Sequence, residues 1–261
     1  MVLADGSYVT ASSDSHPDLF WAIRGAGQCF GVALEFVYKA YEQGPVYAGL
    51  LAFMPDKLDK VIDFANWHHE NNDGNQAVNF GFSQPPDAPV VAVLVGVFFN
   101  GSEEEGKKYI APLLELEPMM NMMATIPYEQ VNAMINFAAT FGARKIFGGS
   151  NVVLPLDKKF VKSVYDEFSQ FTLGNEKMNE SIILFEIQPF NKIVSVPMEG
   201  TACGNRGEYY NVATLFKWYD PSQDEMVRMF SRKLNRRIRE EAGVKKSPGV
   251  GVYSNYMREL N

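Results

Sequence analysis

Apolar residues recur along this chain with two different periods, and these predict strands and helices. Val46–Phe53, Val90–Phe99 and Glu208–Trp218 are rich in β-branched and aromatic residues and are expected to be strands. Helices are expected where apolar residues follow a period of 3.6 and a polar residue can cap the first turn. Three such segments begin at a capping Asp56, Ser102 or Asp157 and end near His69, Leu114 and Phe171.

Further segments complete the expected alternation of strands and helices. A short hairpin is expected at Met1–Thr10, around a turn, and a short helix at Asp14–Arg24. A long basic helix is expected from Ser222 or Asp224 to about Ala242. The other expected strands are Val32–Tyr38, Ala77–Ser83, Lys145–Val153, Ser181–Gln188 and Ile193–Pro197, the last two forming a hairpin.

The order of these elements predicts the fold class. Strands follow one another directly in several places, so the strands can pair as antiparallel neighbours. The apolar stripes of the helices need a sheet to cover. We therefore expect an α+β fold, with an antiparallel sheet flanked by helices on one face.

Composition and charge exclude several classes of protein. Of 261 residues, 46% are hydrophobic and 21% are charged, which is enough for a full core. The net charge of −7 argues against nucleic acid as a partner. The longest apolar run, Pro89–Phe99, is too short to span a membrane, so no membrane partner is expected. Two cysteines, Cys29 and Cys203, are too few for a disulfide framework.

The first residues also bear on location. Met1–Thr10 has no basic region followed by an apolar stretch, so no secretory signal peptide is expected. As it stands, the sequence predicts a cytoplasmic protein. A start upstream of Met1 would leave its location unknown.

The most specific motif lies near the N-terminus. It begins with Leu3-Ala4-Asp5-Gly6 and continues as PDLFWAIRGAGQCFGV over residues 17–32. This string resembles the end of the flavin-binding domain in FAD-linked oxidases of the berberine-bridge-enzyme-like family. Downstream, the resemblance continues in Phe185-Glu186, Pro189-Phe190, Thr201-Ala202, Asn205-Arg206-Gly207, Tyr210-Asn211-Val212, Trp218 and Gly251–Tyr256.

The resemblance implies a division of the chain into three parts. Residues 1–43 would be a small remnant of the flavin-binding domain, 44–248 the substrate-binding α+β domain, and 249–261 a C-terminal tail. The family's phosphate-binding half and its flavin-linked histidine have no counterpart in this sequence. No cofactor is therefore expected on this chain, and FAD only if the chain is part of a longer oxidase. The Gly25–Gly31 segment is expected to be a tight turn rather than a phosphate loop.

Candidate site residues lie on two expected strands. Period-2 alternation places Tyr209, Asn211 and Ala213 on one face of the Glu208–Trp218 strand. We expect Tyr209 and Asn211 to be catalytic. The resemblance implies that this is the active face, and Ala213 then stands where the family often has a glutamine or glutamate. Alanine transfers no proton, so Ala213 is expected only to bind substrate.

A second strand adds a carboxylate. Glu186 and Gln188 share a face of the Ser181–Gln188 strand. If that face is covered, burial would raise the pKa of Glu186 and make it a general acid; if it is solvated, Glu186 is merely part of a polar surface. We expect Glu186 to be catalytic and Gln188 to bind substrate. Arg206 would either clamp an anionic substrate group or pair with a buried carboxylate.

No metal site is expected. His68 and His69 are adjacent on a helix, so their side chains diverge and do not suit one ion. Both histidines are expected to interact as cations with the C-terminal end of that helix.

Three functions remain open from the sequence. The first is a flavin-independent cyclase, pericyclase or isomerase of specialised metabolism, which would orient an apolar small molecule. The second is a portion of an FAD-dependent oxidase. The third is a non-catalytic partner of a full-length homologue. In the first and third cases we expect an interface, in the first a homodimer, at the face that the missing flavin domain would leave uncovered.

Overall fold

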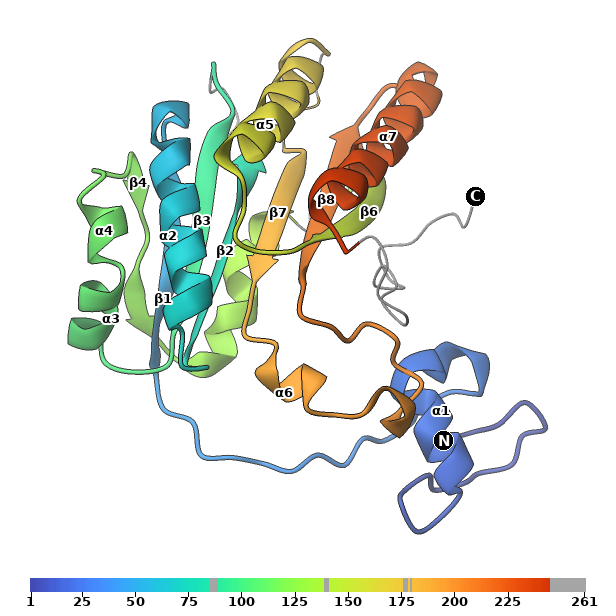
Figure 1. The fold of residues 1–261 in the computed structure, drawn as a ribbon. Helices are drawn as coiled ribbons and strands as arrows, with labels where there is room; N and C mark the ends of the chain where they lie inside the picture. The colour runs from blue at the N-terminus through green and yellow to red at the C-terminus, as the bar shows by residue number, and fades with distance from the viewer. Residues whose placement is uncertain (85–88, 139–140, 176–177, 179, 245–261) are drawn as a thin grey trace.

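A single antiparallel sheet organises the molecule (Figure 1). The structure is a computed structural model that describes residues 1–84, 89–138, 141–175, 178 and 180–244. Its eight strands follow the order β4-β1-β3-β2-β7-β8-β6, and β5 also pairs with β1. The strands are β1 (Val46–Phe53), β2 (Gln76–Ser83), β3 (Ala92–Phe99), β4 (Met120–Asn121), β5 (Ala124–Ile126), β6 (Arg144–Val152), β7 (Ile182–Ile187) and β8 (Tyr210–Trp218).

Helices α2, α5 and α7 lie on one face of this sheet, in front of it in Figure 1. The α+β class with an antiparallel sheet is therefore confirmed. The α-helices are α1 (Pro17–Ala26), α2 (Leu58–Asn71), α3 (Glu103–Tyr109), α4 (Ala111–Leu114), α5 (Lys158–Leu173), α6 (Asn191–Val194) and α7 (Asp224–Ala242). The 3-10 helices are η1 (Gly27–Cys29), η2 (Pro55–Lys57), η3 (Tyr128–Ala138), η4 (Met198–Gly200) and η5 (Pro221–Gln223).

The core lies between the sheet and these helices. Phe80 of β2 and Phe185 of β7 are opposite each other in register, and their rings stack at 4.7 Å. Phe168 of α5 packs against Phe216 of β8. All four side chains are fully buried, so the helix-covered face supplies most of the apolar burial that stabilises the fold.

Two of the three expected helix caps are present. Ser102 and Glu105 form a reciprocal capping box at the start of α3, and Asp157 accepts from the Phe160 N–H at the start of α5. The third expectation was wrong. Asp56 lies within the 3-10 turn that precedes α2, and the residue at the N-cap position, Lys57, makes no capping hydrogen bond through its side chain.

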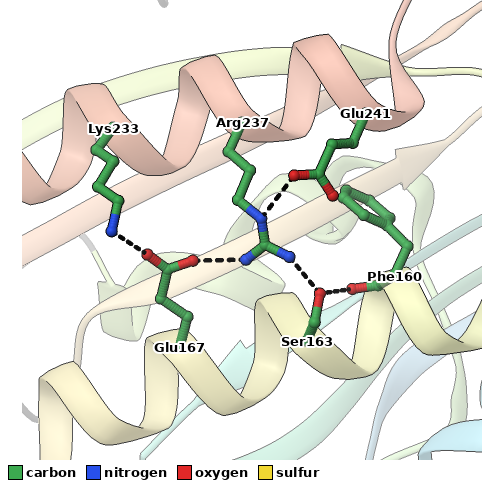
Figure 2. A network of polar contacts seen from close by, with 6 residues as sticks. All are labelled: Phe160, Ser163, Glu167, Lys233, Arg237 and Glu241. Atoms are coloured by element: carbon green, nitrogen blue, oxygen red, sulfur yellow. Dashed lines mark hydrogen bonds and ion pairs between the residues drawn. The ribbon is translucent and has the colours of Figure 1, made fainter.

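Two basic residues of α7, Lys233 and Arg237, pair with acidic residues (Figure 2). The Arg237 guanidinium donates to Glu167 of α5 at 2.6 Å, to Glu241 at 3.0 Å, and to the Ser163 hydroxyl. Lys233 adds an ion pair with Glu167 at 3.4 Å. Arg237 therefore joins α5 to α7 with a planar group whose geometry suits several acceptors at once.

Two expected strands are absent. Residues 191–194 form helix α6, although Ile193 and Val194 favour strands. These two side chains are exposed, so no sheet neighbour stabilises an extended form. Val32 makes only an isolated bridge with Val2, as does Tyr8, so the expected N-terminal hairpin is reduced to single bridges.

The N-terminal segment packs on the loop before β8. The Trp21 indole N–H donates to the Glu199 carbonyl at 2.6 Å, and the Ala202 N–H donates to the Trp21 carbonyl at 3.2 Å. Gly25 allows this contact, because a Cβ there would lie 2.3 Å from the Cys203 nitrogen. The glycine is therefore required by close backbone approach, as expected for a tight turn.

Some expectations fall outside the described residues. The tail 249–261, including the Gly251–Tyr256 motif, is one of them. The division into residues 1–43, 44–248 and 249–261 stays a prediction. Within the described ranges, no helix has the length and apolar character that crossing a lipid bilayer requires.

Candidate functional site

Polar side chains of β2, β7 and β8 lie in register on the face of the sheet opposite α2, α5 and α7, which we call the second face. Asn151 of β6 lies opposite Asn211 and accepts from the Val244 N–H, so the following description concerns the other three. The register places Asn79 of β2 opposite Glu186 of β7, and Glu186 opposite Asn211 of β8. Each alternates with core residues, so all three belong to the second face. Adjacent strands are separated by about 4.8 Å, which brings the three side chains within about 10 Å of one another. We call them the polar row.

A small pocket lies at one end of this row. Its volume is about 60 Å³, which holds a few water molecules but is small beside the several hundred Å³ of a typical metabolite pocket. The pocket therefore marks the place where polar groups converge. A ligand larger than the pocket would extend from it over the second face. Its lining residues are Glu186, Gln188, Phe190, Ile193, Asn205, Gly207, Tyr209, Tyr210 and Asn211.

The structure thus brings together four of the six candidate residues from the sequence: Glu186, Gln188, Tyr209 and Asn211. The alternation predicted for β8 is present, with Asn211 and Ala213 opposite Glu186 and Leu184 on β7. Their catalytic and binding roles stay predictions.

Hydrogen bonds orient two members of the site. The Tyr209 hydroxyl donates to Asn205 Oδ1 at 2.8 Å, and Asn205 Nδ2 makes a long contact of 3.5 Å with Asn211 Oδ1. This chain of contacts directs the oxygen of Asn211 toward Asn205. The amino end of Asn211 is left as the donor that a ligand can meet.

Two buried tyrosines in the pocket lining stay protonated. Burial raises the pKa of Tyr209 to about 12, and it raises the pKa of Tyr210 to about 12. Both phenols therefore keep their protons at neutral pH. The Tyr210 hydroxyl is hydrogen bonded to His69 Nδ1 at 2.7 Å, which connects the pocket to helix α2.

The expected role of His68 was wrong. This ring is fully buried, with Nε2 3.1 Å from the Ile187 carbonyl and Nδ1 2.6 Å from the Tyr109 hydroxyl. Burial lowers the pKa of His68 from 6.5 to about 4, so the ring is neutral rather than cationic at neutral pH. Adjacent positions on α2 therefore place His68 in the core and His69 beside the pocket.

Arg206 and Ala213 lie outside the pocket lining. The Arg206 guanidinium donates to the Pro197 carbonyl at 2.8 Å and to the Thr201 hydroxyl. These contacts hold the loop before β8, on which Asn205 and Tyr209 lie. Ala213 is almost fully buried beside the polar row, where its methyl group adds an apolar surface.

Asn79 was not predicted from the sequence. Its Oδ1 is buried and has no hydrogen-bond partner among the described residues. A buried polar atom without a partner is costly and is a common mark of a functional site. Its position between Val78 and Phe80 was the available signal, because a polar residue alternating with core residues must face the other way.

A metal site would need several His, Cys, Asp or Glu side chains close together. Within the described ranges, no three His, Cys, Asp or Glu side chains are grouped closely enough to hold a metal ion. Cys29 and Cys203 are both free thiols.

Comparison with curated proteins relates this geometry to known relatives. The chain is 32% identical over 255 residues to FAD-linked oxidoreductase pgmH of Aspergillus terreus, covering 92% of this chain and 50% of pgmH. It is 27% identical over 216 residues to FAD-linked oxidoreductase alt4 of Alternaria solani, covering 77% of this chain and 45% of alt4. No family model matches the chain.

Solved structures share the fold. 6-Hydroxy-D-nicotine oxidase from Arthrobacter nicotinovorans superposes with a TM-score of 0.75 at 21% identity, over 100% of this chain and 57% of that one. A berberine-bridge-enzyme-like protein, number 28 of Arabidopsis thaliana, gives a TM-score of 0.74 at 15% identity, over 98% of this chain and 55% of that one. By sequence the chain is related to FAD-linked oxidoreductases, and its fold is that of berberine-bridge-enzyme-like oxidases. It spans about half the length of the curated relatives it matches.

The curated relatives are FAD-linked, so the glycine-rich segment of this chain, residues 25–31, is a candidate for contacts with the FAD phosphates. A dinucleotide needs open backbone N–H groups at a helix N-terminus or loop. Here Gly25 is filled by the Ala202–Cys203 backbone, and a Cβ at Gly31 would lie 2.3 Å from the Val2 carbonyl oxygen. The segment begins within the C-terminal end of α1 and continues into the three-residue η1, so it does not open a long helix. This glycine-rich segment therefore does not form an FAD phosphate site.

Proposed function

We propose that the chain forms the substrate-binding part of an FAD-linked oxidoreductase, with the polar row as the place where the substrate is oriented. The observation that carries the proposal is the convergence of Glu186, Asn211 and Tyr209 on one pocket of a half-covered sheet face. The FAD-linked relatives support the class of activity, and they do not support the expectation of a chain without a cofactor.

The chemistry of the second face defines the kind of ligand. Leu184 is half-buried beside the polar row and offers apolar surface to a planar molecule. Glu186 offers carboxylate oxygens, and Asn211 offers an amide donor. A planar apolar molecule that carries one hydroxyl or amino group therefore fits this surface. Tyr209, held protonated by burial, positions Asn205 and through it Asn211.

A flavin-independent cyclase, pericyclase or isomerase is the second candidate function. It would need no phosphate contact from the glycine-rich segment, where the space around Gly25 and Gly31 is filled. In this case the polar row alone would hold a reactive conformation of the ligand. A non-catalytic partner of a full-length homologue would use the same surface only for binding.

Binding of a defined probe tests the site. We expect 2-naphthol to bind the purified chain more tightly than 2-methylnaphthalene, which has no hydrogen-bonding group. Glu186→Ala and Asn211→Ala should each lower 2-naphthol affinity about fivefold or more, about 1 kcal/mol, in a fluorescence or NMR titration. Thr125→Ala, an exposed position of the same sheet, is the matched control and should bind like the wild type.

Equal binding of the two probes, or unchanged affinity in both variants, would overturn the site. The visible absorbance of the purified chain separates the two functions. A flavin absorbance band that survives gel filtration would show that the chain holds FAD without the glycine-rich segment, and it would support the oxidoreductase. Conversion of a ligand by the colourless chain, followed by mass spectrometry, would favour the second candidate.

A further inference from the structure

Gly96 lies in the middle of β3, between β1 and β2, and no described residue requires a glycine there. It is not among the glycines with a positive φ. A Cβ at Gly96 would lie 3.4 Å from Leu50 Cδ2 and 3.9 Å from Asn79 Cβ, which are ordinary contact distances. Glycine destabilises a strand relative to alanine, because it loses more backbone freedom on folding and packs no side chain. The reason for this glycine therefore lies outside the described fold.

Gly81 of the neighbouring strand β2 shows the contrast. A Cβ at Gly81 would collide with the Ile183 carbonyl oxygen of β7, so the close approach of the two strands requires a glycine. At Gly96 no atom of another described residue lies closer than 3.4 Å to the Cβ position. The two glycines belong to the same sheet, but only Gly81 is explained by the packing of this chain.

Larger side chains surround Gly96 on the second face. Leu50 of β1 and Asn79 of β2 lie directly opposite Gly96 on its two sides. Leu94 and Phe98, two residues away along β3 in each direction, alternate to the same face. All four side chains are half-buried, as is Gly96 itself. The missing side chain therefore leaves a low point among them, with the Gly96 backbone as its floor.

This low point continues the polar row. Gly96 lies opposite Asn79, and Asn79 lies opposite Glu186. Two strand spacings place Gly96 about 10 Å from Glu186. Asn79, between them, has a buried Oδ1 without a partner among the described residues. The row of polar groups thus leads from the pocket to a bare stretch of backbone on which a flat molecule can lie.

We propose that Gly96 sets the length of the ligand, which is a linear molecule of at least three fused rings. Its hydroxyl or amino group is held at Glu186, and its far ring lies on the Gly96 backbone. A glycine inside a strand often marks a place where a ligand approaches the backbone closely. A molecule of two fused rings, held in the same way, ends over Asn79. This inference rests on the proposed function, because the polar row is the anchor, and it adds the size of the substrate.

Two probes that differ by one ring test the inference on the full chain. Wild type should bind 2-anthrol, which has three linear rings, at least about threefold more tightly than 2-naphthol, because the third ring leaves water. Gly96→Ala should weaken 2-anthrol binding at least about fivefold and leave 2-naphthol affinity within about twofold, because the added methyl group takes the place of the far ring only. Gly44→Ala adds a methyl group to an exposed glycine with open space around it, and it is the matched control.

The denaturation midpoint separates binding from a structural role. It should not fall in Gly96→Ala, because alanine is the better strand residue and its Cβ would make ordinary contacts. A lower midpoint, or equal weakening of the two probes, would overturn the inference. Unchanged 2-anthrol affinity would also overturn it, and would favour contact of Gly96 with another polypeptide backbone. If wild type binds neither probe, the proposed function fails as well. If Glu186→Ala weakens 2-naphthol binding and only the Gly96 effect is missing, the polar row stands and this inference alone fails.

Discussion

The two faces of the sheet are built from alternate residues of the same strands, yet they have different tasks. On β7 the neighbours Phe185 and Glu186 point in opposite directions, and on β8 Val212 and Asn211 do the same. The helix-covered face is mostly apolar and is buried, although the polar Ser150 and Thr214 also lie on it. The second face carries polar side chains, one with a buried oxygen that has no described partner.

The difference shows how one strand can stabilise the fold with one face and bind a ligand with the other. Phe185 lowers the free energy of the fold by leaving water, and it needs only apolar neighbours. We propose that Glu186 and Asn211 contact the ligand, while the opposite face of the same strands contributes the stability that holds them in place. Changes one residue apart should therefore have separable effects.

The largest effect should come from the helix-covered face. Phe185→Ala removes a fully buried ring that stacks on Phe80 and should destabilise the protein by about 3–5 kcal/mol. Chemical denaturation measures this loss. Glu186→Ala is the adjacent control, and we expect its free energy of unfolding to stay within about 1 kcal/mol of wild type. Equal losses at both positions would remove the distinction between the faces.

A pH series sharpens the same comparison. Burial lowers the pKa of His68 from 6.5 to about 4. Between these pH values the imidazole is therefore protonated in the unfolded chain and neutral in the folded chain. The stability contributed by the neutral ring is complete above pH 6.5 and is lost as pH falls toward 4, by roughly 3 kcal/mol. Denaturation midpoints of wild type and His68→Gln should therefore converge between these pH values. Parallel curves would show that His68 is not held neutral.

The N-terminal contact should give a smaller effect. A Cβ at Gly25 would collide with the backbone at Ala202 and Cys203, whereas the nearest atom to a Cβ at Gly27 is 4.0 Å away. Gly25→Ala should cost about 1–3 kcal/mol and speed proteolysis within residues 1–43. Gly27→Ala is the matched control and should be cut like wild type. Equal protection in the two variants would mean that the backbones are not packed at this distance.

The smallest effect should come from the network of Figure 2. Glu167→Gln leaves Arg237 with Glu241 and Ser163 as partners. Because this ion pair is only partly buried and still reaches solvent, we expect a loss of about 1 kcal/mol or less, and a smaller loss at high salt. Denaturation at two salt concentrations measures it. A loss as large as that of Phe185→Ala would contradict the assignment of stability to the core.

Strong periodic patterns predicted the elements that carry the site. The strand Val46–Phe53 has the expected bounds, and α7 begins at Asp224 and ends at Ala242 as expected. Their patterns are long and agree with a face that the fold buries. Residues 193–197 and 32–38 also favour strands, but their side chains are mostly exposed and no described strand pairs with them. Propensity without a neighbour does not make a strand.

The sequence predicted which face of a strand each site residue occupies, but not which residues of different strands lie opposite each other. Period 2 placed Glu186 and Asn211 each on a face, but strand order alone decides that they are opposite each other. Asn79 was missed because its neighbour in space lies 107 residues away, as the register of β2 with β7 shows. The contact of His69 with Tyr210 joins α2 to β8 across 141 positions for the same reason.

The most direct test of the account locates a bound ligand on one face of the sheet. In an NMR experiment with selectively labelled methyl groups, bound 2-naphthol should show contacts to the methyls of Leu184, on the second face, and none to those of Val212, on the helix-covered face. Glu186→Ala should weaken the Leu184 contacts, while its free energy of unfolding stays within about 1 kcal/mol of wild type. Contacts confined to methyls elsewhere, or contacts to Leu184 that persist unchanged in Glu186→Ala, would contradict the polar row as the binding site.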